Sequence, residues 1–576
     1  MRNKEIAELL ESIANLLELK GESIFRIRAY REAARRIESL PEDIAKVQEE
    51  GRLESIPGVG ESIAAKIDEY LRAGHLRYLE ELQGQVAPGL AELLQVPGIG
   101  PRRALTIFSN LGVSSIADLK RAAREHRLCK LPGVQEKSEQ KILREIERLQ
   151  QRSRRLLLGV ALPAAEEVIR LLKTNSAVER IDPAGSIRRL KETIGDIDIL
   201  VASNRPREVM DAFISLPIVK EVLAKGTTKS SILTKGNLQM DLRVIKPEEY
   251  GSALQYFTGS KEHNIALREL AIRKRLKLSE YGLFDERTGK RVAGETEEEV
   301  YRVLGLLWIP PELRESRGEI EAAMRGQLPK LLELRDIKGD LHTHTDWSDG
   351  VRTAEEMVRA AVRRGYQYIA ITDHSSGLGV AHGLSPERIL EQRRLIDRLN
   401  VEYAPFRVMH GIEVNIRGDG TLDYGDDILR EFDIVTASIH GGFEQPIEKM
   451  TERIVKAIRH RYVDVLNHPR GRLIGKRAGY AVDLEAVLKA AAQAGTAVEI
   501  NSQPDRMDLD DVWARRAKEL GVRLVIDTDA HDTSHFEFMR YGVAVARRAG
   551  LEKGDVLNTL SLEQILPRLH RTARAA

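Results

Sequence analysis

Cysteine is almost absent from this sequence of 576 residues, which contains only Cys129. A single cysteine excludes an intramolecular disulfide and a thiolate zinc finger. Long apolar runs are absent too, since no stretch approaches the roughly 20 residues that a membrane span needs. The first residues, Met-Arg-Asn-Lys-Glu-Ile, are charged and amphipathic, unlike a signal sequence. We therefore expect a soluble, cytoplasmic protein that has no membrane partner.

The sequence also lacks a surplus of charge of either sign. Its 90 lysines and arginines are balanced by 88 acidic residues, which leaves a net charge of +2. This balance does not exclude a nucleic-acid partner, because acidic metal sites can offset basic patches elsewhere on the chain. A chain of this length is too long for one core, and we expect roughly three to five domains.

The pattern of apolar residues changes several times along the chain and predicts its organisation. Ile6, Leu9, Ile13 and Leu16 follow a 3.6-residue period, which indicates helices. The last part alternates apolar strands with amphipathic helices, roughly seven times, which predicts a parallel α/β barrel. The predicted segments are helical regions at 1–84 and 85–150, an α+β region at 151–250, a mixed and mostly polar region at 251–317, a charged linker at 318–336 and the barrel at 337–576.

A Pro-Gly-X-Gly turn is repeated within the helical regions. Ser55-Ile-Pro-Gly-Val-Gly60 and Gln95-Val-Pro-Gly-Ile-Gly100 each precede a helix, and Leu131-Pro-Gly-Val-Gln135 is a degenerate third copy. A glycine turn at a helix N-terminus presents backbone N–H groups to a DNA phosphate, whatever the base sequence. One copy would indicate only a turn, but the repetition predicts helix-hairpin-helix motifs that bind duplex or gapped DNA. The predicted contacts are Gly58, Gly60, Gly98 and Gly100, whereas Gln135 replaces the second glycine of the third copy.

The stretch from Gly185 to Asp198 contains a strong catalytic signal. Asp196 and Asp198 lie two apart in the alternating run Asp-Ile-Asp-Ile-Leu-Val, which predicts a strand. Both carboxylates then lie on one face, about 7 Å apart along the strand. Two acids on an apolar strand are costly without a cation, and Mg²⁺ prefers carboxylate oxygens as ligands. The alternative is a surface loop followed by an ordinary strand.

Neighbouring residues predict a phosphate site beside these acids. Gly185-Ser186 allows close approach of a phosphate, and Arg188 or Arg189 could neutralise charge on a leaving pyrophosphate. Asp241, in the run Leu-Gln-Met-Asp-Leu-Arg-Val-Ile, is predicted to supply a third carboxylate from an adjacent strand. The pattern indicates nucleotidyl transfer with Mg²⁺ and a triphosphate.

Residues 1–317 resemble the family X DNA polymerases of the polymerase beta type. The matching motifs are the hairpin ending at Gly60, Gly185-Ser-Ile-Arg-Arg189, Gly195-Asp-Ile-Asp198, Asp241-Leu-Arg and Tyr256-Phe-Thr-Gly-Ser260. The resemblance implies a palm at 151–250 and a thumb-like subdomain at 251–317, with two Mg²⁺ ions bound by Asp196, Asp198 and Asp241. It also implies that Ser186 and Arg189 contact the β,γ-phosphates and that Tyr256 and Phe257 lie against the sugar. The implied dNTP site consists of Gly185, Ser186, Arg189, Gly195, Tyr256, Phe257, Gly259, Asn264 and Arg268.

Lys66 aligns with the lysine that forms a Schiff base with 5′-deoxyribose phosphate in this family. An amine nucleophile needs a lowered pKa, which neighbouring cations such as Arg26 or Arg28 would provide. Phe25 stands where the polymerase beta type has a histidine. A lysine on an amphipathic helix is more often simply solvated, so both interpretations stay open.

Histidines and acids follow the predicted strands of the C-terminal region. Each lies at or just after the carboxyl end of a strand, where a parallel barrel has its active site. A mixed set of His, Asp and Glu suits Zn²⁺, Mn²⁺ or Fe, and the set is large enough for two or three ions. One such histidine would indicate a structural role, but the repetition predicts a metal site. The predicted ligands are His342, His344, Asp349, His374, Glu413, His440, His468, Asp529 and His531.

This set resembles the PHP (polymerase and histidinol phosphatase) family, all of whose ligand positions are present here. The resemblance implies a distorted (βα)7 barrel with Zn²⁺ or Mn²⁺ and metal-assisted hydrolysis of a phosphate ester. Arg470 and Arg472 are candidates for binding the phosphate. His382 lies in a polar loop and is expected at the surface.

Together the two halves resemble the bacterial and archaeal family X polymerases with a C-terminal PHP domain. The resemblance implies a monomeric, nucleoid-associated enzyme that fills gaps in base excision repair, using dNTPs on gapped or primer–template DNA. It also implies a 3′→5′ exonuclease in the barrel, with AP endonuclease and 3′-phosphatase activity as further expectations. Two alternatives remain, a barrel that hydrolyses small phosphate esters and a DNA-end-binding scaffold with a structural barrel.

Overall fold

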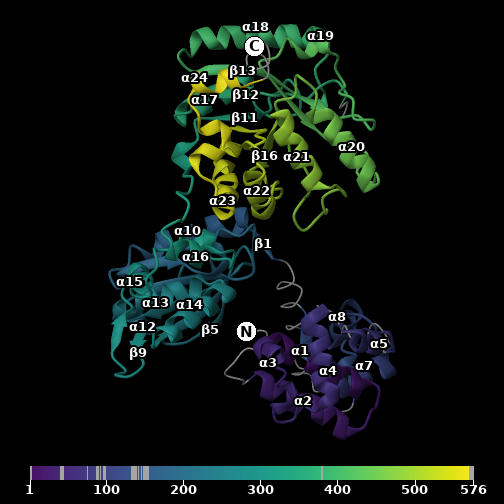
Figure 1. Cartoon of the computed structure of the whole chain (residues 1–576), viewed down its shortest axis with the longest axis vertical. Coiled ribbons are helices and arrows are strands. Elements are labelled where there is room, and N and C mark those ends of the chain that lie inside the picture. The colour runs from purple at the N-terminus through teal and green to yellow at the C-terminus, as the bar shows by residue number, and fades with distance from the viewer. Residues whose placement is uncertain are drawn as a thin grey trace. The chain divides into compact units, whose positions relative to one another are not determined.

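The helices and strands form two compact units in a computed structural model, over Met1–Arg154 and Arg155–Ala576 (Figure 1). The structure describes residues 3–38, 44–73, 76–85, 90, 93–94, 96, 99–131, 139–140, 142–143, 146, 155–377 and 381–569. Each unit has its own hydrophobic core. Within these described ranges, no helix has both the length and the apolar character needed to cross a membrane.

The first unit is helical, as the apolar periodicity predicts. Ile6, Leu10, Ile13 and Leu17 form the fully buried face of α1, and α1 packs against α2. The helices are α1 (Asn3–Leu19), α2 (Ile24–Glu38), α3 (Ile44–Glu49), α4 (Glu61–Ala73), α5 (Arg77–Gln85), α7 (Pro101–Leu111) and α8 (Ile116–Arg124).

The second unit begins with a five-stranded sheet in the order β2-β4-β7-β6-β5. β4 (Ile197–Ala202) and β7 (Gln239–Ile245) are parallel, and Asp198 is the register partner of Asp241. Phe213 of α12 is among the residues buried in this core. The remaining elements are β1 (Leu156–Leu157), α10 (Leu158–Leu172), β2 (Arg180–Pro183), α11 (Gly185–Arg188), β3 (Thr193–Ile194), α12 (Pro206–Ile214), β5 (Val219–Lys225) and β6 (Lys229–Thr234).

A second, smaller core follows this sheet. It contains a buried ion-pair cluster in which Glu297 accepts hydrogen bonds from Arg188 at 2.8 Å and from Arg314 at 2.6 Å. Arg314 is fully buried, so the carboxylate is needed to compensate its charge. The elements are α13 (Tyr250–Thr258), α14 (Lys261–Arg273), β8 (Leu276–Ser279), β9 (Gly282–Asp285), β10 (Arg291–Ala293) and α15 (Glu297–Val303).

Residues 318–336, where the sequence indicated a linker, contain a packed helix. α16 (Glu319–Met324) buries Ile320 and Ala323 in the core of the preceding region. Glu319 Oε1 lies 2.7 Å from His263 Nδ1, which ties the helix to α14. The segment has many charges because only one face is buried, and its helix is too short to show a clear periodicity.

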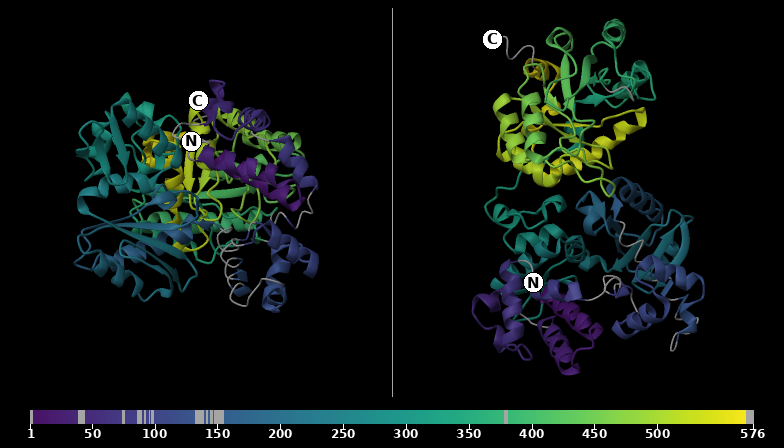
Figure 2. Two further views of the ribbon diagram at one scale, coloured as in Figure 1. Left: turned by 90° about the horizontal axis from the view of Figure 1, so that it is seen from below. Right: turned by 90° about the vertical axis from the view of Figure 1, so that its right-hand side faces the viewer.

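The C-terminal part is a nearly closed barrel of seven parallel strands in sequence order, as predicted. A bridge between Thr343 and Ala530 links the first strand to the segment after the last. The right-hand view of Figure 2 shows helices around these strands. The strands are β11 (Gly339–Thr343), β12 (Tyr368–Ile371), β13 (Arg407–Asn415), β14 (Ile434–Ser438), β15 (Val465–Leu466), β16 (Ala497–Asn501) and β17 (Leu524–Asp527). The helices are α17 (Ala354–Arg363), α18 (Pro386–Glu402), α19 (Asp426–Leu429), α20 (Ile447–Ile458), α21 (Leu484–Ala494), α22 (Asp511–Glu519), α23 (Met539–Ala549) and α24 (Leu562–Ile565).

Candidate active sites

Three aspartates approach one another at the five-stranded sheet. Asp198 and Asp241 are partners in parallel strands, and Asp196 directly precedes β4. Gly185 adopts a φ of +62°, and a Cβ there would lie 3.0 Å from Asp198 Oδ2. Glycine therefore lets the turn before α11 pass close to the carboxylates. The structure brings together the Gly-Ser turn and the acids that the sequence singled out.

The electrostatics of these aspartates are those of a cation site. Burial, together with the charges of Asp241 and Asp196, raises the pKa of Asp198 to about 6. Burial also acts to raise the pKa of Asp241, but hydrogen bonds, led by that from Lys229, hold it below its usual value. Lys229 Nζ lies 2.7 Å from Asp241 Oδ2, so one ammonium already compensates part of the charge. Carboxylates in this number fit Mg²⁺, whose charge would relieve the remaining repulsion on Asp198.

The two arginines that follow Ser186 have different partners. Arg188 donates to both carboxylate oxygens of Glu297 at 2.8 Å, so its guanidinium is part of the buried ion-pair cluster in the neighbouring core. Arg189 donates through Nε to Glu315 at 2.9 Å and through Nη1 to the carbonyl of Thr258. Its Nη2 has no hydrogen-bond partner among the described residues. Arg189 therefore keeps a donor for a phosphate.

Helices α13 and α14 supply further predicted dNTP contacts. The rings of Tyr256 and Phe257 lie 5.1 Å apart in an edge-to-face arrangement. The buried amide of Asn264 donates to the backbone carbonyl of Tyr256 at 2.7 Å, and Arg268 Nε donates to the carbonyl of Asn264 at 3.2 Å. Asn264 thus holds the backbone at Tyr256. Gly259 lies against Arg189, and Gly195 lies against the side chain of Arg155.

The first Pro-Gly-X-Gly turn has the geometry expected of a hairpin. Gly58 has a φ of +87°, and the carbonyl of Gly60 accepts hydrogen bonds from the first turn of α4 at 2.9 Å. In the second copy Gly100 precedes Pro101, the first residue of α7. Gly98 and the third copy with Gln135 lie outside the described residues.

Lys66 of α4 lies in a partly buried, basic and aromatic environment. Its Nζ is 4.7 Å from the ring centroid of Tyr78 and donates to the Ser62 hydroxyl at 3.0 Å. Arg26 donates to the Tyr78 hydroxyl at 2.8 Å. Burial, and after it the charge of Arg26, lowers the pKa of Lys66. The nearby Phe25 is 78% exposed.

The barrel brings together all nine predicted ligands at the carboxyl ends of its strands. Glu413 is central, because its Oε1 lies 3.1 Å from His468 Nε2 and 3.4 Å from His342 Nε2, and its Oε2 lies 2.9 Å from His374 Nδ1. Three overlapping groups have ligand atoms within 4.8 Å of one another: His342, His344 and Asp529; His374, Glu413 and His440; and His344, Asp349, His374 and His531. This number of closely spaced ligand atoms is sufficient to bind two or three metal ions.

The imidazoles of this cluster have nitrogens that the described part of the chain does not satisfy. Both ring nitrogens of His344, and Nδ1 of His440, are buried without a hydrogen bond from the described residues. Burial, with the neighbouring histidines His531 and His374, lowers the pKa of His344 to about 3. A neutral imidazole offers its lone pair to a metal. The orphaned nitrogens and the mixed donor set therefore fit divalent transition metals.

Known families match the regions whose geometry is given above. The matches are a helix-hairpin-helix domain over residues 1–76, a SAM-like helix-hairpin-helix tandem over 90–148, the DNA polymerase beta thumb over 253–315 and the PHP domain over 340–503. The DNA polymerase/3′-5′ exonuclease PolX of Bacillus subtilis (strain 168) is 40% identical over 567 residues, which cover 98% of this chain and 99% of that protein. The chain belongs to the family X DNA polymerases with a C-terminal PHP domain.

Proteins named as probable phosphatases also match part of this family X chain. One from Thermoanaerobacter sp. (strain X514) is 34% identical over 242 residues, which cover 38% of this chain and 89% of that protein. One from Shewanella oneidensis is 34% identical over 203 residues, which cover 33% and 75%. The match to the Thermoanaerobacter protein is about as long as the barrel, which the sequence predicts at 337–576.

Two residues of the PHP barrel near its predicted metal ligands escaped the sequence reasoning. Glu499 Oε1 lies 2.6 Å from His342 Nδ1, so this carboxylate turns His342 Nε2 toward the site. The sequence signal that could have revealed Glu499 was an acidic residue within an otherwise apolar strand, Ala497–Asn501, which is buried. Arg506 Nε lies 3.9 Å from Asp529 Oδ2, and only the fold brings it there.

The arginines that the sequence suggested as phosphate ligands have other partners. Arg472 donates to Glu192 at 2.6 Å, and Arg470 donates to Asp510 at 2.9 Å. Both guanidinium groups stabilise the packing of the loop after β15, because acids distant in sequence fold against it. His382 is exposed, as expected.

Removal of Glu413 tests whether the PHP cluster binds metal. Glu413→Gln deletes a charge that lies within 3.7 Å of five of the histidines, and we expect at least about a tenfold loss of metal affinity. Metal content after dialysis against Zn²⁺ or Mn²⁺, measured by mass spectrometry, checks this. His382→Ala is the control, since this histidine lies outside the cluster. Equal metal content in the two variants and the unmodified chain would contradict the assignment.

Proposed function

We infer that this chain is a DNA polymerase with a second, hydrolytic centre that removes nucleotides from 3′ ends. One observation supports this most strongly: two cation sites of different chemistry lie in one chain, aspartates beside a glycine turn and histidines with acids in a barrel. The Bacillus subtilis relative, whose name states both activities, matches almost the whole chain. We propose gapped or primer–template DNA and dNTPs as the substrates.

In the polymerase reaction, Asp196, Asp198 and Asp241 would hold two Mg²⁺ ions, which would polarise the primer 3′-hydroxyl and neutralise the triphosphate. Gly185 and Ser186 let the phosphates approach the turn, and Arg189 Nη2 donates to them. One phosphodiester forms and pyrophosphate leaves. The remaining members of the proposed dNTP site are Tyr256 and Phe257 against the sugar, Asn264 and Arg268 near the base pair, and Gly195 and Gly259 in the flanking turns.

In the barrel reaction, the nine predicted ligands would hold two or three Zn²⁺ or Mn²⁺ ions, which would activate water and stabilise charge on the phosphate. Glu499 keeps His342 in the orientation that ligation requires. Arg506 is our candidate for binding the phosphate of the substrate, because it is close to Asp529 and its charge suits an anion. Water is proposed to attack the phosphorus of the terminal phosphodiester, so that the 3′-oxygen of the shortened strand leaves and a nucleoside 5′-monophosphate is released.

The helix-hairpin-helix turns suggest how the enzyme holds DNA. Gly58, Gly60, Gly98 and Gly100 are proposed to offer backbone N–H groups to the phosphates, so that binding does not depend on base sequence. Gap filling in base excision repair by a monomeric, cytoplasmic and nucleoid-associated enzyme is the role we propose. AP endonuclease and 3′-phosphatase activity of the barrel belong to the same proposal.

Substitutions in the two centres are expected to separate the two activities. On gapped, 5′-phosphorylated DNA with dNTPs and Mg²⁺ or Mn²⁺, Asp198→Ala should lower primer extension at least about a hundredfold and spare 3′ trimming. His344→Ala should do the reverse. Asp211→Ala and His382→Ala, which change exposed residues outside the two sites, serve as controls. If both activities survive both changes, the proposed sites are wrong.

The similarity to probable phosphatases favours one alternative for the barrel, hydrolysis of small phosphate esters. The His344→Ala variant also distinguishes this alternative from trimming of DNA. If the alternative holds, the unmodified chain hydrolyses free phosphate monoesters much faster than 3′ ends of DNA, and His344→Ala abolishes the hydrolysis of the monoesters.

Lys66 is proposed as the nucleophile that removes 5′-deoxyribose phosphate. Its lowered pKa, caused by burial and Arg26, increases the share of neutral amine. The amine attacks the C1′ aldehyde carbon, and loss of water gives a Schiff base. Loss of a proton from C2′ then breaks the C3′–O bond by β-elimination, and the DNA strand leaves with a 5′-phosphate while the sugar stays on the lysine until water hydrolyses the Schiff base.

Borohydride trapping on DNA with a 5′-deoxyribose phosphate tests this role. Lys66→Ala should abolish the trapped complex, whereas Lys20→Ala should not. Arg26→Gln should raise the pKa of Lys66, because a nearby positive charge is lost, and so shift the pH dependence of trapping to higher pH. Undiminished trapping by Lys66→Ala would exclude Lys66, and an unshifted profile for Arg26→Gln would exclude Arg26 as the cause.

A further inference from the structure

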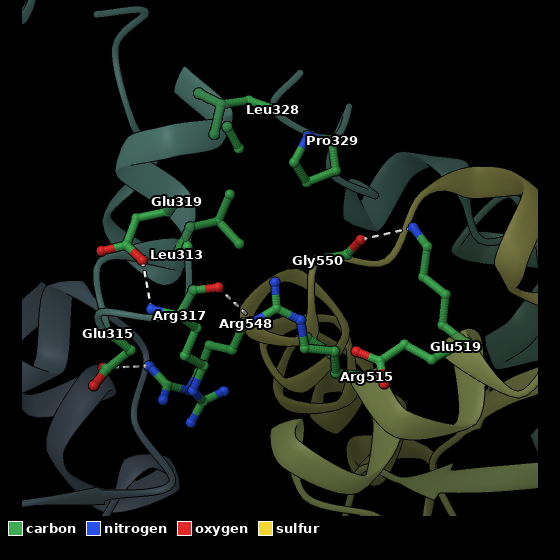
Figure 3. Close-up of a pocket in the computed structure, with 14 residues that line it drawn as sticks. Leu313, Glu315, Arg317, Glu319, Leu328, Pro329, Arg515, Glu519, Arg548 and Gly550 are labelled. Carbon is green, nitrogen blue, oxygen red and sulfur yellow. Dashed lines mark hydrogen bonds and ion pairs between the residues drawn. The ribbon is translucent and has the colours of Figure 1, made fainter. Parts of the chain in front are cut away.

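Arg548, on helix α23 of the barrel, contacts the polymerase part of the same unit. It is 5% exposed. Its Nη1 donates to the backbone carbonyl of Arg189 at 2.8 Å and to Glu315 at 3.0 Å, and its Nη2 donates to Asp511 at 2.8 Å. Figure 3 shows Arg548 and Glu315 at the edge of a cavity of about 360 Å³ between the two parts. Charge-assisted hydrogen bonds of this kind fix the groups that they join.

Glu315 is shared between Arg548 and the arginine proposed to bind the dNTP. Its Oε1 accepts a hydrogen bond from Arg189 Nε at 2.9 Å as well as that from Arg548. Burial alone would raise the pKa of Glu315, but the charges of Arg548 and Arg189 lower it to about 2. The carboxylate is therefore ionised and holds both guanidinium groups.

The balance of charge in this group favours an anion. Glu315 would neutralise Arg189 if it were the only partner, but Arg548 shares Glu315 and also pairs with Asp511, which Arg317 contacts as well, so that two carboxylates face three guanidinium groups. Lys191 Nζ, 3.6 Å from Glu315, adds a further positive charge. Because Arg189 and Glu315 are largely buried, salt screens this surplus little.

The barrel is packed closely enough against the palm for this contact to be specific. A Cβ on Gly159 of α10 would lie 2.4 Å from Cβ of Pro504 in the barrel, so the backbones approach each other there. A separate ion pair, between Arg540 of α23 and Glu166 of α10, also joins the two parts. It lies on the same barrel helix as Arg548 but does not contact Arg189, which makes it a matched control.

We propose that Arg548 is a positioning residue for the polymerase reaction, which acts through Glu315 and the Arg189 backbone to hold Arg189 ready for the triphosphate. The barrel then completes the dNTP site in addition to having its own chemistry. This proposal rests on the proposed role of Arg189 in dNTP binding.

Single-nucleotide insertion on gapped DNA by the full chain, at varied dNTP concentration, tests the proposal. Arg548→Met should raise the KM for dNTP on the order of tenfold, with kcat changed far less, because one charge-assisted contact on Arg189 is lost. Arg548→Lys, which keeps the charge, should recover part of this loss. The 3′ exonuclease activity of both variants should equal that of the unmodified chain.

Two further variants separate the explanations. Arg540→Met should leave the KM for dNTP unchanged, and an equal rise in both variants would mean that domain docking, and not the contact with Arg189, is responsible. Arg189→Met should raise the KM at least as much as Arg548→Met. If Arg189→Met has no effect, the proposed dNTP role of Arg189 is wrong; if it impairs binding while Arg548→Met does not, only the positioning role of Arg548 is overturned.

Discussion

Asp198 and Asp241 lie opposite each other in parallel strands, where burial strengthens the repulsion between their charges. The barrel meets a related condition with histidines, because buried ring nitrogens of His344 and His440 have no hydrogen bond from the described residues. Buried charges that repel each other, and buried ring nitrogens without a hydrogen-bond partner, lower the stability of the folded chain. Divalent cations remove that cost at both centres, and the same cations supply the chemistry of phosphoryl transfer. The two activities of this family X chain therefore depend on one electrostatic requirement.

The fold meets this requirement through parallel strands. Parallel pairing puts Asp198 beside Asp241, and the turn at Gly185 approaches them because glycine has no Cβ. In the barrel, parallel strands bring ligands that are far apart in sequence to one rim. Arg548 then joins the barrel to the polymerase part, since it belongs to the barrel and contacts both Glu315 and Arg189. Each centre is built locally, but the proposed dNTP site uses side chains from both parts.

The sequence predicted the residues whose spacing reflects local geometry. Alternation in the strand revealed Asp196 and Asp198, and recurrence at strand ends revealed the nine barrel ligands. Partners brought together only by tertiary contacts were not visible, such as Glu297 for Arg188 and Glu315 for Arg189, each more than a hundred residues away. For the same reason Arg472 seemed available for phosphate although it pairs with Glu192. The short helix in 318–336 escaped detection because one buried face of six residues gives little periodicity.

The most direct test of the account is anomalous diffraction at the manganese absorption edge, from crystals of the full chain with gapped DNA, a non-hydrolysable dNTP and Mn²⁺. The account predicts two separate groups of peaks, one between Asp198 and Asp241 and one of two or three ions around Glu413. Peaks at only one of these places, or at neither, would contradict the claim that two cation sites organise this enzyme.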